Sequence, residues 1–221
     1  MSKAAAVIVA AGRGVRAGGT EPKQWQNLCG KPVLAHTLAA FQSHPSIEQV
    51  VLVLHADDAQ RANPYLNANT ITVTGGNDRT ASVKNGLAAV TDAPLVLIHD
   101  VARPLITHAL ISRVIDSLGQ QTGAAPALAV TDALWTGSEG HVTGTMDRSG
   151  LYRAQTPQGF DLESIIAAHA AHPGGAADDV QVARAYGLDV AIVPGDEDNL
   201  KITHAEDFAR ADQILRGRDG H

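Results

Sequence analysis

The chain has one cysteine, few aromatic residues and no apolar run long enough to cross a membrane. Cys29 cannot form a disulfide within the chain, which is typical of proteins kept in a reducing cytoplasm. A membrane-spanning helix needs about 18 or more consecutive apolar residues, and no such run occurs. The N-terminus also lacks a basic segment followed by a cleavable apolar stretch, so we expect no export signal and a cytoplasmic location.

Basic residues are also scarce, with 17 Lys and Arg against 23 Asp and Glu, giving a net charge of −6. Proteins that bind duplex nucleic acid normally carry a basic excess, so nucleic acid is not an expected partner. The cations that are present gather in loops rich in Gly, Asp, Thr and Pro, which indicates a small anionic ligand. They are Arg13, Arg16, Lys23, Arg79, Lys84, Arg103, Arg148, Arg153 and Lys201.

Small and β-branched apolar residues are plentiful, and at 221 residues we expect one domain with a substantial core. Several continuous Val, Ile and Leu runs are typical of strands buried on both faces of a parallel sheet. Because these runs alternate with helical patterns, we predict an open α/β sheet flanked by helices. The expected strands are Ala4–Ala10, Gln49–Leu54, Ile71–Val73, Leu95–Ile98, Ala124–Val130 and Val190–Val193. The expected helices are Val33–Ser43, Thr80–Val90, His108–Leu118, Leu162–His172 and His204–Arg216, the last opened by a Thr203/Glu206 capping box.

Residues 131–155, TDALWTGSEGHVTGTMDRSGLYRAQ, interrupt this alternation with turn signals at Gly137–Gly140 and Ser149-Gly150. We predict a β-hairpin arm that projects from the domain. An unpaired hairpin carrying Trp135 and Val142 would expose apolar surface, so the arm predicts a homodimer.

The loop after the first strand is rich in glycine and cations: VIVAAGRGVRAGGTEPKQ, residues 7–24. It is not a Walker A loop, because Gly30-Lys31 is followed by proline and has no glycine five residues earlier. It also misses the dinucleotide fingerprint G-x-G-x-x-G, since Ala17 stands where the third glycine belongs. Glycines let backbone N–H groups close on phosphate oxygens, and Arg and Lys add charge where a reaction develops it.

Three further loops follow predicted strands or precede a helix. TGGNDRTAS, residues 74–82, ends a strand with two glycines and places Ser82 one turn into a helix, where it suits a nucleobase edge. LVLIHDVARP, residues 95–104, delivers Asp100 to the carboxyl end of a strand, where a carboxylate suits a metal ion or a substrate hydroxyl. GDEDNLKIT, residues 195–203, places Asp198 and Lys201 ahead of the last helix.

Together these motifs resemble the 2-C-methyl-D-erythritol 4-phosphate cytidylyltransferase family over essentially the whole chain. The resemblance implies a Rossmann-like nucleotidyltransferase fold and transfer of CMP from CTP to methylerythritol phosphate, with pyrophosphate release and Mg²⁺ as cofactor. The motifs are Ala10-Ala11-Gly12-x-Gly14-x-Arg16, Pro22-Lys23-Gln24, Gly75-Gly76, Arg79, Ser82, His99-Asp100, Ala102-Arg103-Pro104, Asp147-Arg148, Thr156-Pro157-Gln158 and Asp198-Asn199-x-Lys201-x-Thr203.

The resemblance also implies a role for each matching residue. Arg16, Lys23 and Lys201 would stabilise charge at the α-phosphorus. Nucleotide binding would fall to Ala10, Ala11, Gly12, Gly14, Gly76, Asn77 and Ser82. Acceptor binding would fall to Asp100, Arg103, Thr156 and, from a partner chain, Arg148. Asp100 and Asp198 are the candidate metal ligands.

Four positions depart from the family pattern: Val101, Ala133, Ala177 and Asp179. Ala133 removes an expected hydroxyl from the arm, which keeps a pentitol phosphate such as ribitol 5-phosphate open as the acceptor. A sugar-1-phosphate nucleotidyltransferase and a regulator that binds nucleotide without catalysis are the more distant alternatives.

Overall fold

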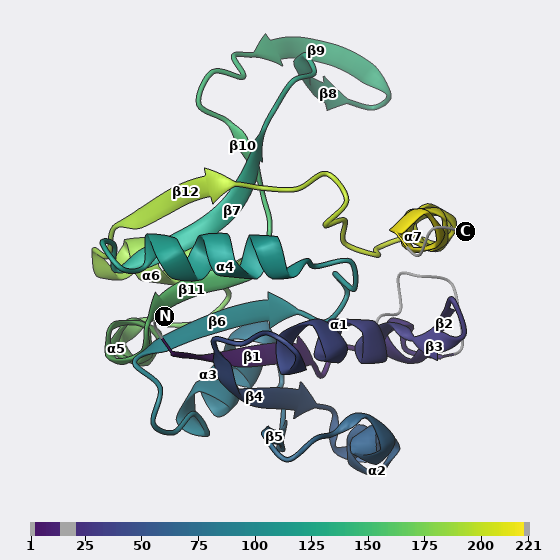
Figure 1. Cartoon of the computed structure of the whole chain (residues 1–221). Helices are drawn as coiled ribbons and strands as arrows, with labels where there is room; N and C mark the ends of the chain where they lie inside the picture. Colours follow the sequence, from purple (N-terminus) through teal and green to yellow (C-terminus); the bar gives the residue numbers. More distant parts are fainter. Residues whose placement is uncertain (1–2, 14–20, 219–221) are drawn as a thin grey trace.

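The computed structural model describes residues 3–13 and 21–218 and has three layers, a central sheet with helices on both faces (Figure 1). Within these residues eight strands form the sheet, in the order β12, β7, β10 with β11, β6, β1, β4, β5. The strands are β1 (Ala4–Ala10), β4 (Ile47–Leu54), β5 (Thr70–Thr74), β6 (Leu95–Asp100), β7 (Gly123–Ala129), β10 (Tyr152–Ala154), β11 (Gln158–Asp161) and β12 (Val190–Pro194). Only β10 and β11 run against the others, so the predicted, mostly parallel α/β fold is confirmed.

Alternate side chains of the central strands supply two separate cores, one on each face of the sheet. One face is covered by α1 (Val33–Gln42) and α4 (His108–Ser117), which pack on Ile8, Leu52 and Leu97. The opposite face is covered by α3 (Arg79–Ala88), α5 (Leu162–Ala171) and α6 (Asp179–Tyr186). Burial on both faces explains why β1, β4 and β6 are continuous apolar runs.

The last helix, α7 (Ala205–Arg218), joins a smaller apolar cluster with Leu28 of the two-residue strand β2 (Asn27–Leu28), which pairs with β3 (Lys31–Pro32). Its start differs from the predicted capping box. The Asp207 carboxylate, not that of Glu206, accepts hydrogen bonds from the backbone N–H groups of Thr203 and His204. The Thr203 hydroxyl instead donates to the Lys201 carbonyl, because the helix begins one residue later than the prediction required. The short helix α2 (Ala59–Ala62) completes the set of α-helices in the described residues.

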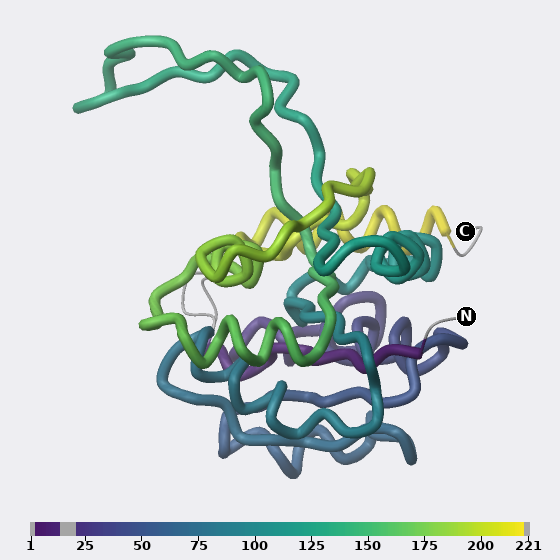
Figure 2. The backbone as a smooth tube through the Cα atoms, turned by 90° about the vertical axis from the view of Figure 1, so that its left-hand side faces the viewer, coloured from purple at the N-terminus to yellow at the C-terminus, as the bar shows by residue number. Residues whose placement is uncertain are grey.

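The predicted arm is a β-hairpin of β8 (Leu134–Ser138) and β9 (His141–Met146), which pair with each other and stand clear of the domain (Figure 2). After β9 the chain returns to the main sheet, where β10 pairs with β7. Trp135, Val142 and Met146 are each more than half exposed on it.

Among the strands of the sheet and the α-helices, four were not predicted as such: β11, α2, α6 and β10, which was assigned to the arm. All four are short, and β11 contains the polar Gln158 followed by Gly159, so none has a recognisable apolar period. No helix in the described part of the chain is long and apolar enough to span a membrane.

Candidate nucleotide-binding cleft

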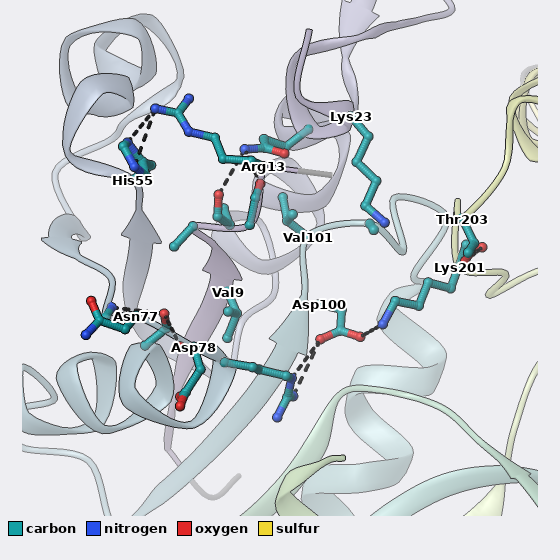
Figure 3. A pocket seen from close by; sticks show the side chains of 18 residues that line it. Val9, Arg13, Lys23, His55, Asn77, Asp78, Asp100, Val101, Lys201 and Thr203 are labelled. Atoms are coloured by element: carbon teal, nitrogen blue, oxygen red, sulfur yellow. Dashed lines mark hydrogen bonds and ion pairs between the residues drawn. The ribbon is translucent and has the colours of Figure 1, made fainter. Parts of the chain in front are cut away.

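A cleft of about 800 Å³ opens where β1 and β6 end and α3 begins (Figure 3). Parallel strands bring their carboxyl ends to one edge of the sheet, so the loops that follow them meet there. Nine of the predicted site residues line the cleft: Ala10, Ala11, Gly12, Lys23, Gly76, Asn77, Ser82, Asp100 and Lys201. Gly14 and Arg16 lie outside the described residues.

At one end of the cleft the backbone turns tightly into α3. The Asp78 carboxylate caps this helix by accepting from the Ala81 N–H at 2.7 Å. The Ser82 hydroxyl accepts from the Gly76 N–H at 3.0 Å and donates to the Asp78 carbonyl at 2.8 Å. A Cβ atom on Gly76 would lie 2.4 Å from the Ala81 Cβ atom, so this approach of the two backbones requires glycine.

The loop that leaves β1 is held by Gln24, for which no separate role was predicted. Its buried side-chain amide donates to the carbonyls of Ala10 and Gly12, at 3.1 Å each. Both carbonyls flank the turn at which the strand becomes the glycine-rich loop. Gln24 therefore fixes the backbone at this edge of the cleft.

Lys23 and Lys201 reach the cleft from segments far apart in the chain and lie in the same region of it (Figure 3). Lys23 Nζ donates to the Ile202 carbonyl at 3.0 Å, which ties the end of the first loop to the segment that carries Lys201. Lys201 Nζ lies 2.7 Å from Asp100 Oδ2.

The Asp100 carboxylate is shared between two cations. Its other oxygen, Oδ1, lies 3.4 Å from Arg79 Nε and 3.5 Å from Arg79 Nη2. Burial acts to raise the pKa of Asp100, but the charges of Lys201 and Arg79 outweigh it and hold the pKa well below its usual range. Asp100 is therefore an anion, and both of its oxygens are engaged.

Behind Asp100 lies a buried chain of hydrogen bonds through His99 and Thr156. The Thr156 hydroxyl accepts from the Asp100 N–H at 3.2 Å and lies 3.0 Å from His99 Nδ1. His99 Nε2 lies 3.2 Å from the Arg103 carbonyl, to which it donates, so Nδ1 accepts from Thr156. Burial lowers the pKa of His99 to about 3, and the imidazole is neutral.

Four predicted residues do not line the cleft: Arg103, Arg148, Thr156 and Asp198. Arg103 donates to the carbonyls of Asn199 and Ala154, and Thr156 is buried behind Asp100 as described. Arg148 is on the exposed arm and donates to the Thr131 carbonyl. Asp198 is about half exposed, with Arg218 Nη2 3.6 Å from its Oδ2.

Two residues that line the cleft, Arg13 and His55, were not predicted as site residues. Arg13 was recognised only as a loop cation, and His55 was given no role. Arg13 Nη2 lies 2.6 Å from His55 Nδ1 and 2.5 Å from Asp57 Oδ2. This contact ties the first loop to the turn after β4, and the 42-residue separation of Arg13 and His55 left no local pattern from which to predict it.

Carboxylates that could hold a metal ion are few. No cluster of three or more His, Cys, Asp or Glu side chains with metal-binding geometry occurs among the described residues. The lining contains Asp78, whose Oδ1 caps α3, and Asp100, whose oxygens face cations. This donor set fits a hard cation that takes most of its ligands from a bound substrate. It does not fit an ion whose ligands all come from the protein.

Comparison with known proteins places this geometry in a family. Residues 4–217 match the family model described as IspD, 2-C-methyl-D-erythritol 4-phosphate cytidylyltransferase. The chain is 59% identical to the protein of that name from Roseobacter denitrificans, over 99% of this chain and all of the relative. It is 61% identical to a bifunctional enzyme IspD/IspF from Ruegeria pomeroyi, of which it spans 56%. A solved structure of the cytidylyltransferase from Thermus thermophilus, 32% identical, superposes with a TM-score of 0.82 over 95% of this chain and 98% of that one.

The buried neutral His99 makes a specific prediction for pH dependence. In the unfolded chain a histidine takes up a proton near pH 6.5, whereas His99 in the folded protein does so only near pH 3. The unfolded state therefore binds more protons between these values, and the stability that His99 contributes falls as pH drops below 6.5, by up to about 1.4 kcal/mol per pH unit.

Urea unfolding of the wild type and of His99→Gln between pH 7 and pH 5 measures this. Gln can donate and accept as His99 does but does not titrate, so the variant should show a shallower fall in the free energy of unfolding. Other titrating groups, His44 among them, are common to both proteins and cancel in the comparison. Parallel curves for the two proteins would show that His99 is not buried in the neutral form.

Proposed function

Because the chain belongs to the IspD family, we propose that it transfers CMP from CTP to 2-C-methyl-D-erythritol 4-phosphate and releases pyrophosphate. A phosphate oxygen of the acceptor attacks the α-phosphorus of CTP, and the bond from that phosphorus to the oxygen bridging to the β-phosphate breaks. The observation that carries the proposal is the meeting of Lys23 and Lys201 in one cleft with the Gly76–Ser82 turn. This reaction supplies a step of non-mevalonate isoprenoid synthesis, and we place it in the cytoplasm.

Catalysis of this reaction is chiefly positioning and charge neutralisation. The attacking phosphate is already an anion, so it needs no strong base, but its repulsion by the triphosphate has to be offset. Lys23 and Lys201, with Arg16, would supply positive charge around the α-phosphorus. Backbone N–H groups of the loop from Gly12 to Lys23, Gly14 included, would contact the triphosphate. Backbone groups of Ala10 and Ala11 would contact the cytosine and ribose.

The cytosine would bind at the turn into α3. Asn77 offers both a carbonyl acceptor and amide donors there, and the Gly76–Ser82 hydrogen bond fixes the turn. The Gly75-Gly76 pair allows the backbone to come close to a flat ring. A base of different donor and acceptor pattern would leave these groups unpaired, which gives the site its specificity.

The acceptor would lie beyond Asp100, at the end of the cleft nearer Lys201. Asp100 would orient its hydroxyl groups, while Thr156 accepts from the Asp100 N–H and Arg103 ties the loop after β6 to the Asn199 carbonyl, near Lys201. Arg148 would reach the acceptor phosphate from a partner chain. The arm exposes Trp135, Val142 and Met146, an apolar surface that a second copy of the chain would cover.

Mg²⁺ would be held mainly by phosphate oxygens of CTP, with Asp100 as the one cleft carboxylate placed near Lys201. Bound there, the ion would neutralise charge on the triphosphate and on the leaving pyrophosphate. Asp198 lies outside the cleft lining, and its pairing with Arg218 favours a structural role for it.

The acceptor is tested by a panel assay of pyrophosphate release. With CTP and Mg²⁺, we expect turnover with 2-C-methyl-D-erythritol 4-phosphate and at least about a hundredfold lower kcat/KM with ribitol 5-phosphate. ATP, GTP and UTP serve as controls for the base. Faster turnover with ribitol 5-phosphate would identify a pentitol phosphate enzyme. Failure to release pyrophosphate with any acceptor would leave only the regulator that binds nucleotide without catalysis.

The two lysines are tested by alanine substitution. Lys23→Ala and Lys201→Ala should each lower kcat by about 10²–10³-fold, the usual loss for one group aimed at developing charge. Lys31→Ala is the matched control, because Lys31 is exposed on β3 and does not line the cleft. Circular dichroism should show that all three variants are folded. Near-normal turnover in either cleft variant would remove that lysine from the mechanism.

The role of the arm is tested by mixing inactive chains. If Arg148 completes the site of a partner, Arg148→Ala and Lys23→Ala chains refolded together should recover about a quarter of wild-type activity, because half of the dimers would be mixed and each would have one complete site. Light scattering at micromolar concentration should report a dimer. A monomer, or a mixture no more active than its components, would count against the proposed arrangement.

A further inference from the structure

Arg79 lies between two carboxylates at the edge of the cleft. It is the first residue of α3, and its guanidinium faces Asp100 at 3.4 Å on one side and Asp179 at 2.8 Å on the other. Its side chain is 26% exposed. Burial acts to lower the pKa of Arg79, but Asp179 and Asp100 outweigh it and raise the pKa above its already high value.

Asp179 is the inner end of this row of charges and has no access to solvent. It is the first residue of α6, with a relative exposure of 0%. Its Oδ2 accepts from Arg79, its Oδ1 lies 3.1 Å from Nε2 of the buried His169, and its backbone N–H donates to Gln158 Oε1 at 3.0 Å. Both carboxylate oxygens and the backbone are therefore held in place.

The charges alternate along the row: Asp179, Arg79, Asp100, Lys201. Removing one charged group from such a row leaves the neighbouring charge partly buried and without its full counter-charge. Arg79 without Asp179 would be balanced by Asp100 alone and would compete with Lys201 for that carboxylate. Lys201 Nζ lies 2.7 Å from Asp100 Oδ2. The position of the Lys201 ammonium group therefore depends on whether Arg79 is shared between Asp100 and Asp179.

We propose that Asp179 is a positioning residue for the cytidylyl transfer, which it serves by holding Arg79 so that Asp100 and Lys201 keep their places in the cleft. The inference rests on the proposed function. Asp179 itself does not line the cleft, so it acts only through Arg79. A shift of about 1 Å in a charged group that stabilises a transition state is enough for a rate loss of up to about a hundredfold.

The isosteric variant Asp179→Asn tests this at saturating CTP and acceptor. We expect kcat to fall about tenfold or more, with the KM for CTP within about threefold of wild type, since the base and triphosphate contacts are untouched. Asp189→Asn is the matched control. It removes the same charge from another Asp–Arg pair, that of Asp189 with Arg184 at 2.6 Å, which is exposed and does not line the cleft. Its kcat should stay within about twofold of wild type.

A cycle with Lys201→Ala separates positioning from general support of the fold. If Asp179 acts through Lys201, adding Asp179→Asn to Lys201→Ala should cost less than about twofold further in kcat. Should Asp179→Asn fail to fold, Arg79→Lys replaces it in both experiments. Lysine keeps the charge at this partly exposed position but cannot bind both carboxylates, so the same loss in kcat is expected.

Three results would overturn the inference: wild-type kcat in Asp179→Asn, an equal loss in Asp189→Asn, or fully multiplicative losses in the double variant. Wild-type kcat in Arg79→Lys would do so where that variant is used. A wild-type protein that releases no pyrophosphate with any acceptor would instead overturn the proposed function, and that result is obtained before any variant is made.

Discussion

The register of β1 between its two neighbours is the constraint on which the site depends. Val9 lies opposite Asp100 of β6, and Ala10 lies opposite Leu54 of β4, so three strands end at nearly the same level. The Leu54 carbonyl then accepts from the Gly75 N–H at 2.7 Å, which brings the loop after β5 to the same place. The loops after β1, β4, β5 and β6 thereby meet at one cleft, and Lys201 and Thr203 join it from the C-terminal part of the chain.

Small side chains make this convergence possible. β1 is rich in alanine and is almost wholly buried between helices on its two faces. On the inner face of α3, a Cβ atom on Gly86 would lie 2.5 Å from Val7 Cγ1, so only glycine lets the helix sit this close to the sheet. The N-terminus of α3, which carries Asp78 and Arg79, is placed by that contact. The packing of a core helix thus determines where the cleft ends.

A feature of the fold or of the cleft could be predicted from the sequence where it depends on residues close together in the chain. The strands that end at the cleft are continuous apolar runs followed by glycines and cations, so the fold and the position of the cleft could be predicted. The nine predicted site residues that line the cleft were assigned through the resemblance to a known family. The start of α7 could not, because both Glu206 and Asp207 are acidic and only the position of the first turn decides which one caps. Gln24 and His99 are single polar residues whose burial is set by elements distant in the chain. The Arg79 contacts join residues 21 and 100 positions apart, and no local pattern encodes them.

A carboxylate in a site for two anions needs a physical reason, and the arrangement around Asp100 supplies one. An isolated anion there would repel both the triphosphate and the acceptor phosphate, whereas Asp100 is balanced by Lys201 on one oxygen and Arg79 on the other. The long side chain of Lys201 is flexible, and the short contact to Asp100 restricts it before substrate binds, which lowers the entropy lost on binding. A metal ion at Asp100 would have to displace one of these cations. The row of charges therefore favours a carboxylate that orients cations and acceptor hydroxyls, and the proposed Mg²⁺ would take most of its coordination from the phosphates themselves.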